Sequence, residues 1–191
     1  MLGNYMGILM LNEREDNIKS LTKSRPIAAI PIGGRYRIID FVLSNMVNSG
    51  IHNVGIFTNT KSRSLVGHLG SGKPWDLDRK INGLFVFNLT SERSELRDID
   101  VLNDNVEYIY KSKQDYVIIS SSYMLCNLDY NEAATYHEES GSDITLLYKK
   151  TNSGKIDYLS CSTLYINEEN KVLSVGKNIG VSDKLNISME M

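Results

Sequence analysis

The sequence has few of the residues that build disulfide frameworks, and its charges almost cancel. Only two of the 191 residues are cysteines, so a disulfide network of the kind found in small secreted domains is excluded. The formal net charge is −2, which gives no strong attraction to nucleic acid or to an anionic membrane. The first residues have neither a basic segment nor a long apolar run. These absences predict a cytoplasmic protein that binds neither nucleic acid nor membranes.

Short apolar runs alternate with segments of helical spacing along most of the chain. Hydrophobic residues make up 41% of the sequence, which favours a folded globular protein over disorder. Residues 5–11, 53–58, 115–119 and 144–148 are predicted strands, and residues 12–25 a loop. Predicted helices cover 36–49, 62–69, 99–109 and 131–141, the last capped by Asp129. This alternation predicts an α/β fold, a mostly parallel, Rossmann-like sheet with helices on both faces.

The last quarter of the chain has a different pattern. Residues 158–167 and 171–175 flank a polar turn, which predicts an antiparallel hairpin appended to the sheet. Open α/β sheets bind ligands beyond the carboxyl ends of their strands. The loops after Leu11, Thr58 and Ile119 are therefore where we expect the chemistry.

Two signals of nucleotide or metal binding are weak. Residues 67–74, GHLGSGKP, nearly match the phosphate loop GxxxxGK[ST], but Pro74 stands where a hydroxyl should bind magnesium. A predicted helix rather than a strand precedes this segment, so we interpret it as a glycine-rich surface loop. The three histidines, His52, His68 and His137, are scattered, and we expect them in surface or cap positions.

Three longer blocks are more specific. Residues 25–51 read RPIAAIPIGGRYRIIDFVLSNMVNSGI, residues 74–83 read PWDLDRKING, and residues 126–130 read CNLDY. In this order they resemble the bacterial glucose-1-phosphate adenylyltransferases, which make ADP-glucose for glycogen. The resemblance extends over about residues 6–191 and implies one nucleotidyltransferase-like domain over residues 1–191. It also implies that this domain is truncated at its C-terminal end, because the family's following β-helix domain is absent from the sequence.

The positions that carry the family's chemistry are changed. The glycine-rich loop of the family falls on residues 10–18, where Asn17 stands in place of the catalytic arginine. Ile27 replaces a phosphate-binding lysine, and Tyr123 replaces a magnesium-binding aspartate. A phenol is a poor magnesium ligand compared with a carboxylate. The resemblance therefore implies no catalytic residue, no bound cofactor and no metal here, with magnesium only in a catalytic partner.

Other positions of the family pattern are retained. Arg25 and Arg37 match arginines that contact an effector phosphate or sulfate, although surface charge or an ion pair would explain them equally well. Asp100, Lys177 and Ser188 match substrate-contacting positions and are the predicted remnants of a substrate site. An ordinary exposed lysine is the alternative for Lys177.

This combination resembles the D-type subunit of the family, which implies a catalytically impaired regulatory subunit. Such a subunit would modulate a catalytic glucose-1-phosphate adenylyltransferase partner in ADP-glucose and glycogen synthesis, with a phosphorylated effector as a further ligand. One alternative is an active nucleotidyltransferase that makes ADP-glucose and pyrophosphate from ATP and glucose 1-phosphate. A second alternative is a sugar-phosphate or nucleotide sensor. Residues 12–17 discriminate between the first two functions, because activity requires a loop that holds the triphosphate.

Overall fold

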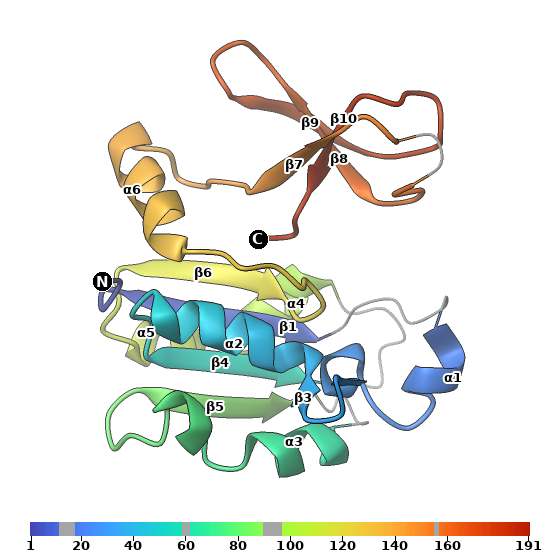
Figure 1. Cartoon of the computed structure of the whole chain (residues 1–191). Coiled ribbons are helices and arrows are strands. Elements are labelled where there is room, and N and C mark those ends of the chain that lie inside the picture. Colours follow the sequence, from blue (N-terminus) through green and yellow to red (C-terminus); the bar gives the residue numbers. More distant parts are fainter. Residues whose placement is uncertain (12–17, 59–61, 90–96, 155–156) are drawn as a thin grey trace. The chain divides into compact units, whose positions relative to one another are not determined.

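A computed structural model describes residues 1–11, 18–58, 62–89, 97–154 and 157–191 (Figure 1). The chain divides into two compact units, Met1–Tyr136 and His137–Met191. No helix among the described residues is long and apolar enough to cross a membrane.

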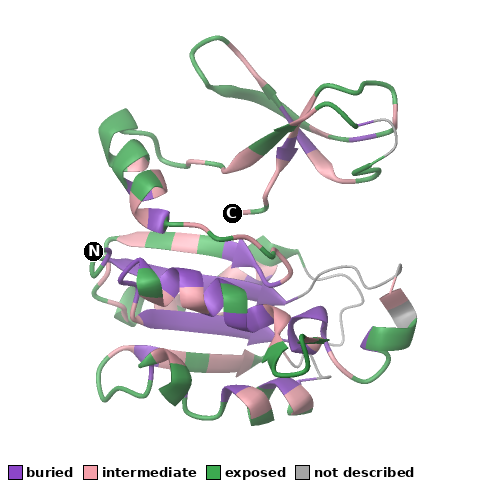
Figure 2. Ribbon diagram, viewed as in Figure 1, coloured by how far each residue is buried: buried purple, intermediate pink, exposed green. Residues whose placement is uncertain are grey.

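The first unit contains a parallel sheet of four strands in the order β5-β4-β1-β6. All three pairs of neighbouring strands are parallel, which confirms the predicted sheet type. Every residue of the two central strands is buried (Figure 2), as expected for strands covered on both faces. The strands are β1 (Tyr5–Leu11), β4 (Asn53–Thr58), β5 (Gly83–Asn88) and β6 (Tyr116–Ser121).

Helices pack on both faces of this sheet. On one face lies α2 (Ile38–Asn48), and a β-carbon added at Gly7 of β1 would lie 2.6 Å from the Met46 sulfur of this helix. On the other face, Met6, Ile8 and Met10 form a core with α4 (Asp98–Asp104) and α5 (Val106–Lys111). The predicted helical layers on both faces are therefore confirmed.

The predicted helix over 99–109 is wrong as a single element. The chain breaks at Asn105, whose backbone φ of −118° and ψ of 19° lie outside the helical range. The side-chain amide of Asn105 donates a hydrogen bond to the Val101 carbonyl at 2.9 Å. This bond gives a partner to a carbonyl near the C-terminal end of α4. Apolar spacing continues across the break because both short helices pack on the same face of the sheet.

Several short elements were not predicted from the sequence. Part of the predicted loop 12–25 is helical, since α1 covers Lys19–Thr22, and residues 12–17 lie outside the described residues. The helix predicted over 62–69, before the glycine-rich segment, is confirmed as α3 (Arg63–Leu69). A small hairpin and two turns of 3-10 helix were not predicted. They are η2 (Ile27–Ala29), β2 (Pro31–Ile32), β3 (Tyr36–Arg37) and η3 (Lys73–Trp75).

The second unit is built on a separate antiparallel sheet in the order β7-β10-β8-β9. The predicted hairpin is confirmed as β8 (Ser162–Ile166) and β9 (Val172–Lys177). It extends this sheet rather than the parallel one. The predicted strand at 144–148 is wrong, because the chain pairs with β10 (Leu185–Ser188) only over β7 (Tyr148–Thr151). The helix α6 covers Tyr130–Ser140.

Candidate functional site

The carboxyl ends of the parallel strands bring three sequence-distant positions to one edge of the sheet. Leu11 pairs with Thr58, and Met10 pairs with Ser121. Thr58 and Ser121 are buried, and their hydroxyls have no hydrogen-bond partner in the part of the chain that the structure describes. Two buried hydroxyls thus lie at the edge where the loops after Leu11, Thr58 and Ile119 were predicted to carry the chemistry, and that role stays a prediction. Asn17 lies outside the described residues.

Ile27 is part of the hydrophobic interior. It begins the 3-10 turn η2, all three residues of which are buried, and its own side chain is only 8% exposed. The Ile27 carbonyl accepts a hydrogen bond from the Ile30 N–H at 2.9 Å, which closes the turn. The Ile27 side chain therefore fills the core, and its assignment to the position of a phosphate-binding lysine stays a prediction.

The segment after β6 is held to α2 by polar contacts. The Asn45 amide donates to the Cys126 carbonyl at 2.8 Å, and the Ser49 hydroxyl accepts the Tyr130 N–H at 2.9 Å. Tyr123 lies half-buried in this segment, and its assignment to the position of a metal-binding aspartate stays a prediction. No three His, Cys, Asp or Glu side chains among the described residues lie close enough to hold a metal ion.

Asp129 caps helix α6, as predicted. Its Oδ1 accepts hydrogen bonds from the Asn131 backbone N–H at 3.0 Å and from the Asn131 amide at 2.7 Å. The backbone hydrogen bond in particular holds the pKa of the Asp129 carboxyl below its usual value. These contacts commit this carboxylate to the helix end rather than to a metal.

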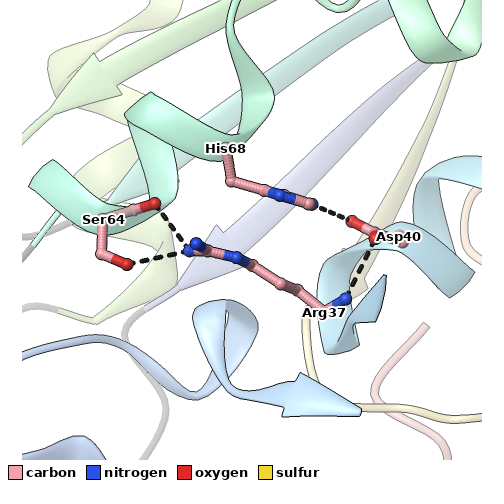
Figure 3. Close-up of polar contacts among 4 residues, drawn as sticks. All are labelled: Arg37, Asp40, Ser64 and His68. Carbon is pink, nitrogen blue, oxygen red and sulfur yellow. Dashed lines mark hydrogen bonds and ion pairs between the residues drawn. The ribbon is translucent and has the colours of Figure 1, made fainter. Parts of the chain in front are cut away.

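Arg37 connects the start of α2 to α3 (Figure 3). Its Nη1 donates to the Ser64 carbonyl at 2.6 Å and to the Ser64 hydroxyl at 2.8 Å. The Arg37 backbone N–H donates to Asp40 Oδ2 at 3.0 Å, and the other oxygen of Asp40 lies 2.6 Å from His68 Nε2. These contacts give Arg37 a structural role, and effector binding by the same guanidinium stays a prediction.

The pairing of His68 with Asp40 was not predicted from the sequence. The two residues are 28 positions apart, and their side chains are 21% and 11% exposed. Asp40 in the first turn of α2 was the available signal, because an acidic side chain there stabilises the helix start and can accept a second donor. Arg25 is half-buried, and within the described residues its guanidinium makes no hydrogen bond or ion pair.

The Asp100 side chain caps the start of its own helix, α4. Its carboxylate accepts hydrogen bonds from Arg97 Nε at 2.9 Å and from Arg97 Nη2 at 3.0 Å. A third bond from the Arg97 backbone N–H, at 3.3 Å, closes the first turn of α4. The structure therefore gives Asp100 a capping role; substrate binding by this residue stays a prediction.

Lys177 and Ser188 lie in the same row of the antiparallel sheet, on strands separated by β8. Lys177 of β9 pairs with Ser162 of β8. Ile187 of β10 pairs with Thr163 of β8, so the following residue, Ser188, lies opposite Ser162 on its other side. Lys177 is exposed, and the Ser188 hydroxyl accepts the Glu190 N–H at 3.1 Å. Substrate binding by these two residues stays a prediction.

Asn178, which follows Lys177, holds the nearby loops. Its buried amide donates to the Gly154 carbonyl at 2.6 Å and to the Tyr158 carbonyl at 3.0 Å. Its Oδ1 accepts the Gly180 N–H at 2.9 Å. Asn178 therefore organises two loops around the end of β9.

Comparisons with known proteins agree with this architecture. A family model described as nucleotidyl transferase matches residues 16–156. The glycogen biosynthesis protein GlgD of Bacillus subtilis is 40% identical over 168 residues, which are 86% of this chain and 49% of that protein. The glucose-1-phosphate adenylyltransferase of Fervidobacterium nodosum is 35% identical over 147 residues, 75% of this chain and 35% of that protein. The chain thus spans about half the length, or less, of these curated relatives.

A solved structure supports the same fold. A putative glucose-1-phosphate thymidylyltransferase from Bacillus anthracis, crystallised with sucrose, superimposes with a TM-score of 0.75. The superposition covers 97% of this chain and 69% of that chain at 12% identity, which bears on the fold alone. The family model covers well over half of the sequence. The chain belongs to the nucleotidyl transferase family.

Proposed function

We propose that the protein is a non-catalytic subunit that modulates a catalytic glucose-1-phosphate adenylyltransferase in glycogen synthesis. The names of the similar proteins support a role in glycogen synthesis, since they include a glycogen biosynthesis protein and glucose-1-phosphate adenylyltransferases. The non-catalytic part is supported by the buried aliphatic side chain of Ile27, because the family resemblance assigns a phosphate-binding lysine to this position.

The described residues at the carboxyl edge of the sheet add to this argument. Leu11, Thr58 and Ser121 are uncharged, and Tyr123 carries no carboxylate for magnesium. One cation at 4 Å from a phosphate contributes about 1 kcal/mol in water and about 4 kcal/mol at an effective dielectric of about 20. The loss of the lysine, the arginine and the magnesium ligand together would remove most of the stabilisation that pyrophosphate departure requires.

Pyrophosphate release tests the proposal. The full-length protein is assayed alone with ATP, magnesium and glucose 1-phosphate, and circular dichroism verifies that it is folded. We expect no detectable turnover. The protein is then titrated into the catalytic subunit, and we expect the KM for ATP or the response to a phosphorylated effector to change with a saturable dependence.

Two outcomes separate the alternatives. Turnover by the protein alone within about tenfold of the usual enzymatic range of 1 s⁻¹ or more would contradict the proposal and identify an active nucleotidyltransferase. No turnover, no effect on the catalytic subunit and measurable binding of a nucleotide or sugar phosphate would instead identify a sensor.

A further inference from the structure

We draw no further inference here: the strongest candidate, the uncharged outer edge of the parallel sheet along β6, where the side chains of Val117 and Ile119 are exposed, carries none because nothing in the described part of the chain shows what covers it.

Discussion

Replacement of Gly55 by alanine should destabilise the parallel-sheet unit. Gly55 lies in the central strand β4, and a β-carbon there would lie 2.6 Å from Tyr108 Cε1 and 3.2 Å from the Tyr108 hydroxyl oxygen. The ring must therefore move before the two residues reach ordinary van der Waals contact. Tyr108 has little room to do so, because its ring centroid lies 4.9 Å from that of Phe87 and 5.4 Å from that of Phe85.

The magnitude follows from two costs and one gain. Overpacking of a core typically costs about 1–3 kcal/mol. Movement of the ring also weakens the hydrogen bond that the Tyr108 hydroxyl donates to Asn53 Oδ1 at 3.0 Å, a contact worth about 1 kcal/mol. Alanine is more favourable than glycine within a strand by roughly 0.5–1 kcal/mol, which offsets part of the loss. We expect a net loss of about 1–3 kcal/mol in the free energy of unfolding.

Urea unfolding followed by tryptophan fluorescence measures this loss in the correct unit. Trp75 is the only tryptophan in the sequence and belongs to Met1–Tyr136, so its signal reports on the parallel-sheet unit. Gly67→Ala is the matched control. Gly67 lies in α3 with no atom within 4 Å of an added β-carbon, so this variant should gain roughly 0.5–1 kcal/mol.

A double-mutant cycle with Tyr108→Leu isolates the contact. Leucine removes the ring atoms that the new methyl group would meet, so Gly55→Ala should cost nothing in this background. Equal stability of Gly55→Ala and the unaltered protein, within about 0.5 kcal/mol, would refute the packing argument. So would an equal cost of Gly55→Ala in both backgrounds.

Three further changes test the polar contacts. Arg37→Met should lower the free energy of unfolding by about 1–3 kcal/mol in the same fluorescence assay, because the Ser64 carbonyl and hydroxyl both lose the hydrogen bond that Arg37 Nη1 donates; an unchanged midpoint would argue against the structural role. Asn178→Ala should speed hydrogen exchange at the Gly180 amide, measured by mass spectrometry, because Oδ1 no longer accepts from it. Burial raises the pKa of Tyr130 to about 12, so the folded state keeps a proton that the unfolded chain releases. Stability should be complete below about pH 10 and fall between about pH 10 and 12, and Tyr130→Phe should reduce the fall.

The sequence by itself determined three strands of the parallel sheet, β1, β4 and β6, and its principal helix, whereas β5 was not predicted. Every residue of the run 5–11 is apolar, and the run 53–58 is apolar apart from Asn53 and Thr58 at its ends. Such runs are typical of strands buried on both faces, and both strands are fully buried. The predicted helix over 36–49 is α2, and Gly50 just beyond it has the positive φ of 95° typical of a helix end. The assignment of Ile27 and Tyr123 to a lysine and an aspartate position of the family rests on the sequence alone.

Only the tertiary structure decided which polar groups meet. Arg37 and Ser64 are 27 positions apart, and nothing in their local sequence specifies the contact between α2 and α3. Lys150 of β7 lies beside Asn186 because β7 pairs with β10, which the predicted strand at 144–148 did not indicate. Hydrophobic periodicity reports which side of an element faces the interior, and that information is local. A hydrogen bond between distant residues depends on ångström-scale distances between elements, which are set by how their apolar faces pack.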